Sequence, residues 1–483
     1  MASVSPEKVL GIPAMRLLPL LAVLLLIAPA TPVVSARTPT EHPRPHIVIF
    51  MVDDLGYADV GFNGGTEIQT PHIDALAAEG TILAAHYVQP VCSPTRAALM
   101  TGRYATRTGV YTIVRPNARW GLPLDERTLA DALRQAGYST AITGKWHLGE
   151  FEPRYRPTAR GFDHQYGHYF GAIDYYTHQR DGQVDWYRND QPLTETGYST
   201  ELIAGEAERL IAEHNPNAAD KPLFLYVPFN GVHAPLQVPE RYLQPYSALK
   251  GNRRTYAGML AAVDAAIGRI TTALRKANML QNTLILFTAD NGGPSPGAVT
   301  SNGSLRAGKG TLYEGGIRSC AFVRWPDRIP AGTRSEQPVH IIDWYPTLVR
   351  LANGSLEQPK PLDGLDLTPM LCDGKPSPHE SLLLVQSPQR AAIRAGEWKL
   401  LQSRTTTADE KNPKSAKATK KKAKAAGKQP DVSADGLELY NLREDPSEQQ
   451  NLASTQPEIA ARLRKQLQQL LQDAVPPGNP VEP

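Results

Sequence analysis

Short apolar runs of strand length recur along the chain, and polar residues or glycines follow each of them. The clearest runs are His46–Val52, 222–228 and Thr283–Ala289, and 138–143 also has the pattern of a strand. Nearly continuous apolar strands are typical of the buried centre of a parallel sheet that helices cover. We therefore expect an α/β protein built around a large, mostly parallel sheet sandwiched by helices.

Helical patterns lie between these runs. The segment that starts at Thr70 has a capping residue, a proline at the first helical position and apolar residues at helical spacing, and Gly80 ends it. A longer amphipathic pattern covers 256–277. Further helices are predicted over 125–136, 343–351 and 457–473.

The pattern changes after residue 370. The short segments 391–394 and 398–401 predict an antiparallel hairpin, and 437–442 predicts a last strand before the closing helix. We expect an α/β domain over 44–370 and a smaller C-terminal domain over 371–483, with an antiparallel sheet plus a helix. A segment rich in Lys, Ala and Ser, 405–434, is predicted to be a disordered insertion. Alternatively, it attracts a polyanionic substrate.

The N-terminus has the pattern of a secretory signal peptide. Lys8 and Arg16 precede the apolar run 17–28, and the small residues at 34–36 suit cleavage after Ala36. An uncleaved anchor is the alternative, although the run is shorter than the ~20 residues that span a bilayer. We expect an exported protein, periplasmic or secreted (lysosomal in an animal), with a signal peptide over 1–36 and no stable membrane insertion.

Composition narrows the class of protein. The 483 residues are 41% hydrophobic and 20% charged, which is typical of a globular protein, and the net charge of +3 gives no support to nucleic-acid binding. Three cysteines, Cys92, Cys320 and Cys372, do not make a disulfide scaffold, and their spacing fits no zinc site. If Cys92 is consumed chemically, Cys320 and Cys372 remain as a possible pair.

Acidic and amide side chains follow two of the predicted strands. Asp53 and Asp54 come after the first strand, and Asp290 and Asn291 follow Thr283–Ala289. Ligands bind at the carboxyl ends of strands in open α/β sheets, and adjacent carboxylates repel each other unless a cation lies between them. The four side chains predict a calcium or magnesium site. Tight turns are the alternative explanation of both pairs.

Cationic and imidazole side chains occupy similar positions. Lys145 and His147 follow the strand at 138–143, and His233 follows the strand at 222–228. Lys309 lies in a glycine-rich segment, 303–310, that nearly matches a phosphate-binding loop but has Gly310 in the Ser/Thr place. These residues suit anion binding and proton transfer. Surface placement, or a structural role for each histidine, is the alternative.

Cys92 begins the string Cys-Ser-Pro-Thr-Arg, which continues to Thr-Gly-Arg at 101–103. The string predicts a turn leading into a helix, whose N-terminus is electropositive, and Arg96 adds a positive charge. A nucleophile at position 92 would therefore ionise easily. A buried structural cysteine is the alternative.

The Cys92 string resembles the signature of the type I sulfatases, in the alkaline phosphatase superfamily. Gly-Tyr-Ser-Thr at 137–140 with Gly-Lys-Trp-His-Leu-Gly at 144–149 is similar to the second signature of that family. The strings at 232–239, 256–259 and 360–364 resemble most the arylsulfatase B (N-acetylgalactosamine-4-sulfatase) branch. The chain departs from the animal enzymes in lacking most of their cysteines and in its lysine-rich insertion.

This resemblance implies an activity and a set of roles. The activity is hydrolysis of sulfate monoesters, of sulfated sugars or aryl sulfates, after a formylglycine-generating enzyme has oxidised Cys92 to Cα-formylglycine (3-oxoalanine). In the implied site, one Ca²⁺ is held by Asp53, Asp54, Asp290, Asn291 and the residue at 92, which Arg96 orients. Lys145, His233 and Lys309 bind sulfate, and His233 or Lys309 protonates the leaving alcohol. His147 takes a proton from the hydrated aldehyde.

Two other classes of function remain open from the sequence. One is a metal-dependent phosphatase or phosphonate hydrolase with the same fold. The other is a non-catalytic secreted glycan-binding protein. The oligomeric state is not predicted.

Overall fold

The main sheet of the protein has ten strands, and its centre is parallel. The computed structural model describes residues 43–214, 221–403 and 436–478, all within the unit Pro43–Pro483. The strands, in spatial order, are β14 (Thr333–Ser335), β2 (Thr81–Leu83), β13 (Ala321–Arg324), β11 (Thr283–Ala289), β1 (His46–Val52), β10 (Leu223–Phe229), β4 (Ser139–Lys145), β5 (His164–His168), β8 (Tyr187–Arg188) and β9 (Gln191–Pro192).

The four predicted strands are confirmed, and they are neighbours. β11, β1, β10, β4 and β5 all run parallel, and β1 pairs with β10 on one side and β11 on the other. At the flanks, β13 and β8 join the sheet antiparallel, so the sheet is mixed. No strand was predicted at β8, because a run of two residues carries no readable periodicity.

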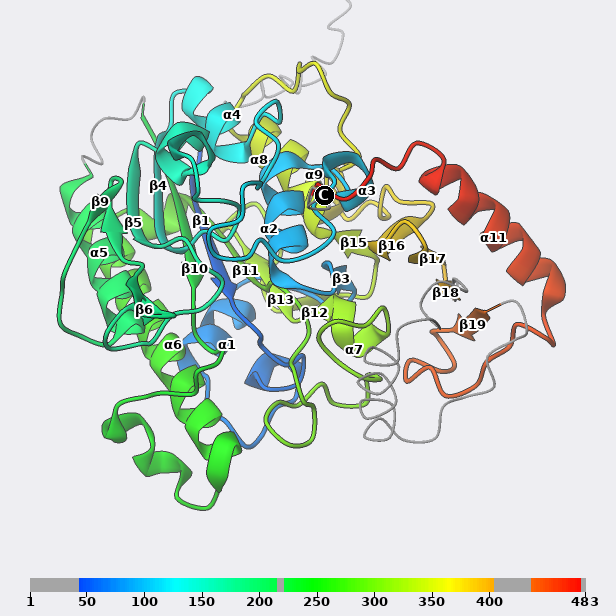
Figure 1. Cartoon of the computed structure of the whole chain (residues 1–483), viewed down its shortest axis with the longest axis horizontal. Helices are drawn as coiled ribbons and strands as arrows, with labels where there is room; N and C mark the ends of the chain where they lie inside the picture. Colours follow the sequence, from blue (N-terminus) through cyan, green and yellow to red (C-terminus); the bar gives the residue numbers. More distant parts are fainter. Residues whose placement is uncertain (1–42, 215–220, 404–435, 479–483) are drawn as a thin grey trace, which may run out of the picture. The chain divides into compact units, whose positions relative to one another are not determined.

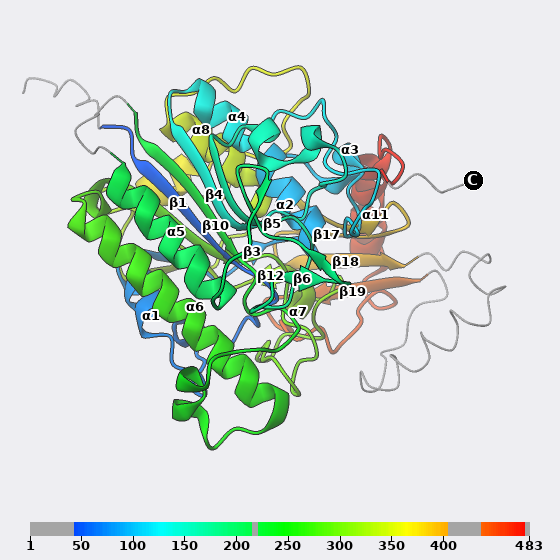
Figure 2. The ribbon, with the colours of Figure 1, turned by 60° about the vertical axis from the view of Figure 1, so that its left-hand side comes forward.

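Helices cover both faces of the main sheet. Alternate residues of β1 enter two different cores: Ile47, Ile49 and Met51 pack on one face, and Val48 and Phe50 on the other. Figure 2 shows α5 and α6 along one face and α4 and α8 on the opposite face. The helices are α1 (Pro71–Ala78), α2 (Cys92–Thr101), α3 (Ala105–Thr108), α4 (Leu129–Gln135), α5 (Ser199–Glu213), α6 (Gly251–Lys276), α7 (Glu314–Ile317), α8 (Trp344–Leu351), α9 (Thr368–Asp373) and α11 (Pro457–Leu471).

The starts of two helices and the predicted cap of a third differ from the prediction. α4 begins at Leu129 rather than at 125, because Thr128 forms a capping box with Asp131. α6 begins at Gly251, five residues before the expected start at 256. Thr70 makes no capping bond to the backbone of α1, because its hydroxyl instead donates to Asp74 Oδ2 at 3.0 Å.

Helix α6 is a core element. Within the described part of the chain, it is the one helix whose length and apolar composition would allow it to cross a membrane, and 72% of its apolar window is buried inside the protein. Its buried residues include Met259, Val263 and Ile270, which pack in the core together with β1.

The C-terminal part forms a second, antiparallel sheet, as predicted (Figure 1). Its strands, in order, are β16 (Leu382–Ser387), β17 (Arg390–Ala395), β18 (Trp398–Ser403) and β19 (Leu437–Asn441). Leu384 and Tyr440 share a buried cluster with Tyr87 and Ile317 from the larger part of the chain. A three-stranded sheet of β12 (Arg318–Ser319), β3 (His86–Tyr87) and β15 (Val339–His340) lies in that larger part.

Some predictions lie outside the described residues or fail. The predicted signal peptide over 1–36 and nearly all of the lysine-rich insertion at 405–434 lie outside the described part, and the domain boundary at 371 stays a prediction. The pairing of Cys320 with Cys372 is wrong, because both are free thiols. Cys320 is buried in the core on the α6 face, whereas Cys372 packs against the core on the opposite face.

Candidate active site

The predicted site residues converge where the central parallel strands end. Asp53 follows β1, Asp290 follows β11, and Lys145 is the last residue of β4. The N-terminus of α2 points at the same place, so that its first residue, Cys92, lies among them. Parallel strands bring these residues together because their carboxyl ends share one edge of the sheet.

Cys92 is fully buried and contacts both a carboxylate and an ammonium group. Its Sγ lies 3.5 Å from Asp53 Oδ1 and 3.4 Å from Lys309 Nζ. Burial, and then the charges of Asp290 and Asp53, raise the pKa of the thiol well above its ordinary value. The expectation of an easily ionised thiol is therefore wrong for the unmodified cysteine, because burial and two carboxylates outweigh the helix terminus and the lysines.

Each of the two adjacent acids pairs with a lysine. Lys145 Nζ lies 2.5 Å from Asp53 Oδ2, and Lys309 Nζ lies 2.5 Å from Asp54 Oδ1. Burial alone would raise the pKa of Asp53, but Lys145 and His233 reverse this, and the net pKa lies below the ordinary value. The pKa of Asp54 also lies below its ordinary value, because His233 and Lys309 outweigh the effect of burial. Both carboxylates are therefore anionic at neutral pH.

The donor set fits a hard divalent cation. Ligand atoms of Asp53, Asp54, Cys92 and His233 all lie within 4.8 Å of one another. Asn291 donates its amide to Asp54 Oδ1 at 2.8 Å, and its own Oδ1 is buried with no hydrogen-bond partner among the described residues. Such an unpaired buried oxygen next to two carboxylates suits a calcium or magnesium ligand.

Asp290 is paired with the guanidinium group of Arg96. Its Oδ2 accepts from Arg96 Nη2 at 2.8 Å, and its Oδ1 accepts the backbone N–H of Asp54 at 3.3 Å. The remaining Nη1 of Arg96 donates to the carbonyl of Lys145 at 2.9 Å. Arg96 therefore joins the ends of β11 and β4 and fixes Asp290.

His147 presents one free ring nitrogen. Its Nε2 donates to the carbonyl of Val114 at 3.0 Å, so Nδ1 carries the lone pair, and Nδ1 is buried with no partner among the described residues. Burial, then Lys145 and Arg96, lower the pKa of His147 well below its ordinary value, so the ring is neutral. The residue has φ 60°, and a Cβ at Gly171 would approach the ring to 2.5 Å, so the neighbouring loop closes tightly over it.

His233 has the opposite arrangement of its ring. Its Nδ1 donates to the carbonyl of Ala234 at 2.6 Å, which leaves Nε2 facing the acids, 3.6 Å from Asp54 Oδ2. Unlike the buried groups around it, its side chain is 23% exposed. His233 therefore stands between the acidic cluster and solvent, where an incoming ligand would meet it.

An open cavity of about 610 Å³ leads to Cys92, and its rim was not predicted. His147, His233 and Lys309 line it, and the rim adds two loops that contribute Thr112, Ile113, Val114, Arg115, Pro116, Asn117, Arg180 and Asp181. The sequence supported no residue-level prediction for either loop. Arginine and asparagine next to Pro116 are the one local hint, and many surface turns share it.

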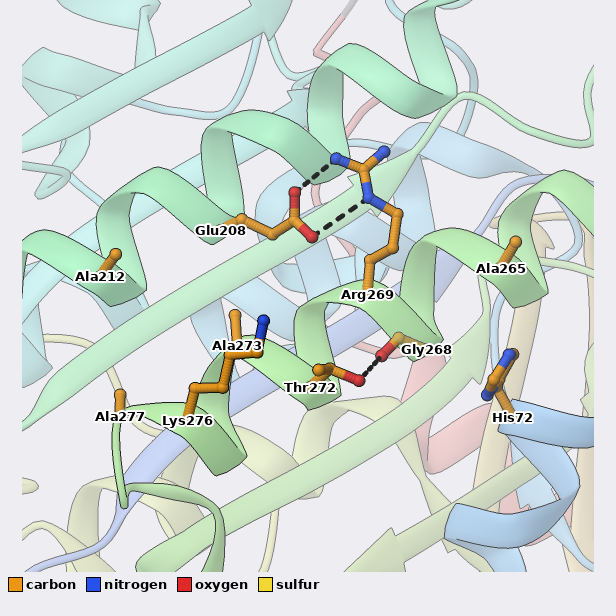
Figure 3. Close-up of a pocket in the computed structure, with 10 residues that line it drawn as sticks. All are labelled: His72, Glu208, Ala212, Ala265, Gly268, Arg269, Thr272, Ala273, Lys276 and Ala277. Carbon is orange, nitrogen blue, oxygen red and sulfur yellow. Dashed lines mark hydrogen bonds and ion pairs between the residues drawn. The ribbon is translucent and has the colours of Figure 1, made fainter.

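A second cavity shares no lining residue with the cavity at Cys92. It has a volume of about 850 Å³ and lies against α5 and α6, where Glu208 and Arg269 form an ion pair (Figure 3). Small residues such as Ala212 and Gly268 line most of it, with His72 of α1 at one side. None of the residues predicted for the site lines this cavity, so the cavity at Cys92 is the candidate active site.

Comparison with known proteins places the chain in a family of hydrolases. The Sulfatase family model matches residues 45–355. Arylsulfatase J of Mus musculus is 38% identical over 463 residues, which cover 90% of this chain and 77% of that protein. The N-acetylgalactosamine-6-sulfatase of Canis lupus familiaris is 35% identical over 377 residues, covering 73% and 70%.

Solved structures agree with this placement. The crystal structure of Ps i-CgsB in complex with k-i-k-neocarrahexaose has a TM-score of 0.77 and 32% identity, and the match covers 90% of this chain and 94% of that one. The chain belongs to the sulfatase family. It is an arylsulfatase-type sulfuric ester hydrolase with the alkaline-phosphatase-like fold of that family. Its membership of the arylsulfatase B branch stays a prediction.

Proposed function

We propose that this enzyme removes sulfate from sulfated sugars, with Cα-formylglycine at position 92 and one calcium ion. The observation that carries the proposal is the position of Cys92, which lies at the floor of an open cavity, between Asp53 and Lys309. The names of one similar protein, an N-acetylgalactosamine-6-sulfatase, and of one similar structure, Ps i-CgsB in complex with k-i-k-neocarrahexaose, support a sugar as the substrate.

The metal and the modified residue supply what the ordinary side chains lack. Asp53, Asp54, Asp290, Asn291 and the residue at 92 would hold the ion, which supplies positive charge to the nucleophile and to the sulfate oxygens. As an aldehyde hydrate, the residue at 92 would supply an attacking oxygen and a second hydroxyl whose loss of a proton re-forms the aldehyde and expels sulfate. An unmodified, neutral thiol offers neither.

The surrounding residues bind sulfate and move protons. Lys145 and Lys309 place two ammonium groups beside the residue at 92, where they can attract sulfate oxygens. His233, which faces the site through Nε2, can donate a proton to the leaving alcohol, as can Lys309. His147 is neutral and offers the lone pair of Nδ1, so it can accept a proton when sulfate departs.

Maturation and export complete the proposal. A formylglycine-generating enzyme is the required partner, because the conversion of Cys92 is an oxidation that this chain's own site does not explain. Export through the signal peptide at 1–36 fits an enzyme that meets sulfated polysaccharide outside the cytoplasm.

The test is an assay of purified protein, co-expressed with a formylglycine-generating enzyme, on 4-nitrophenyl sulfate and 4-nitrophenyl phosphate. We expect faster turnover of the sulfate ester, loss of turnover after a chelator, and recovery with Ca²⁺. Calcium should also raise the melting temperature of the chelated protein, because it binds only the folded state. A preference for phosphate would support the phosphatase alternative, and no turnover of either ester would favour the glycan-binding one.

A further inference from the structure

The cavity above Cys92 is larger than a single sulfate group requires. Its volume of about 610 Å³ lies within the range of pockets that enclose a whole organic ligand, about 300–1,000 Å³. The groups that would grip the sulfate all lie at the floor. The rim formed by the two loops is therefore available to bind the rest of the substrate.

Two arginines make this rim cationic. Arg115 is exposed and forms no ion pair with any acid in the described part of the chain. Arg180 lies 3.5 Å from Asp181, but this pair is open to solvent, with side chains 35% and 80% exposed, so it is weak. With Asp181 included, the rim carries a net charge of +1, separate from the lysines at the floor that would bind the sulfate ester.

The loop that carries Arg115 is fixed on both sides. The backbone N–H of Val114 donates to Ser93 Oγ at 3.0 Å, and its carbonyl accepts from His147. The backbone N–H of Asn117 donates to Glu150 Oε1 at 2.7 Å. A guanidinium on a backbone held at both neighbouring positions loses less freedom when it binds a ligand.

We infer that Arg115 and Arg180 form a second anion subsite, for a negatively charged group on the saccharide next to the sulfate ester that is cleaved. Asn117 and Asp181, on the same rim, suit hydrogen bonds to sugar hydroxyls. The second anion is a sulfate ester or a uronate carboxylate, both of which a planar guanidinium binds through two hydrogen bonds. The inference rests on the proposed function and narrows its substrate class to polyanionic glycans.

The test measures binding to the full chain with Cys92→Ala, which leaves sulfate esters intact. Calorimetry compares three disaccharides of N-acetylgalactosamine: one with a single sulfate and a neutral neighbour, one with a second sulfate, and one with a uronate neighbour. We expect the second sulfate or the uronate to raise affinity about tenfold. The disaccharide with the larger increase in affinity identifies which anion the subsite prefers.

Variants then assign the gain to the two arginines. Arg115→Gln and Arg180→Gln should each reduce the preference for the doubly charged sugar at least threefold. Arg119→Gln is the matched control, because Arg119 stacks on Phe151 at 5.2 Å and does not line the cavity. Circular dichroism shows whether each variant is folded.

Equal affinity for all three sugars, no binding of any of them, or a preference that survives both substitutions would overturn the inference. The proposed function is judged separately, by turnover of 4-nitrophenyl sulfate by the mature enzyme. That ester lacks a second anion, so its hydrolysis can succeed while the subsite inference fails.

Discussion

At position 92, a thiol with a raised pKa lies between a carboxylate and an ammonium group. A cysteine enzyme would need the opposite, a thiolate. The surroundings favour instead a residue at 92 with oxygen atoms, which could bind a cation and attack a sulfate ester. This residue is the chemical centre of the account.

Replacing this residue gives the first prediction. Cys92→Ala should abolish sulfate ester hydrolysis and change the melting temperature little, because alanine fits the space of a cysteine that makes no strong hydrogen bond. Cys372→Ser, at a partly exposed free thiol far from the cavity, is the control and should retain activity. Hydrolysis by Cys92→Ala would disprove the role of residue 92.

Glu150 gives a prediction on pH and stability. Burial raises its pKa to about 7, against the opposing N–H of Asn117. A carboxyl with a raised pKa in the folded state stabilises the fold at low pH, and this contribution is lost as pH rises through about 7. Glu150→Gln keeps an acceptor for Asn117 but does not titrate, so its melting temperature relative to wild type should rise between pH 5 and pH 8.

The measurement is differential scanning calorimetry at both pH values. Glu240→Gln, at an exposed carboxyl, is the control and should show no such change. A difference between Glu150→Gln and wild type that is the same at pH 5 and pH 8 would contradict the raised pKa.

At the scale of elements, the ends of strands were predictable and the loops above them were not. β1, β4, β10 and β11 are buried parallel strands, so their sequences are readable apolar runs, and the functional residues follow directly in the chain. The rim depends on contacts distant in sequence. Ser93 with Val114 and Asn117 with Glu150 set its shape, and no periodicity reports such pairs.

Asn302 connects three of these loops. Its Oδ1 accepts from the backbone of Tyr57 and of Gly293, and its Nδ2 donates to the carbonyls of Gly293 and Ala307. Because Ala307 precedes Lys309 by two residues, Asn302 positions the loop that brings Lys309 to Cys92. Asn302→Ala should lower kcat about tenfold or more, since small displacements of Lys309, the proposed sulfate-binding group, are costly.

Steady-state kinetics on 4-nitrophenyl sulfate tests this prediction. Ser304→Ala, at an exposed residue of the same loop, is the matched control. An unchanged kcat in folded Asn302→Ala would show that the loop keeps its position without this side chain.

At the scale of the whole molecule, a buried ion cluster connects the small sheet to the larger part of the chain. Lys399 of β18 lies 2.8 Å from Glu314 and 2.7 Å from Glu448, and all three side chains are fully buried. Burial would raise the pKa of Glu314, but Lys399 reverses this and the pKa falls to about 2. Nothing in the local sequence predicted the cluster, because its members are spread over more than a hundred residues.

Lys399→Met should therefore destabilise the protein strongly. Removal of the lysine takes the counter-charge from Glu448 and leaves Glu314 with its longer pair to Arg318, at 3.6 Å. Loss of one partner from a buried pair costs about 3–5 kcal/mol. Urea denaturation measures the change, with Lys250→Met at an exposed position as control. A loss below about 1 kcal/mol would mean that the cluster contributes little beyond an exposed pair.

The central claim, that this sulfatase acts through a modified Cys92, is tested most directly by the mass of the peptide that contains residue 92. The peptide is prepared from enzyme that has just been shown to hydrolyse 4-nitrophenyl sulfate. The account predicts an aldehyde or its hydrate at this position, in an amount that rises with specific activity. An unmodified thiol in a fully active preparation would contradict it.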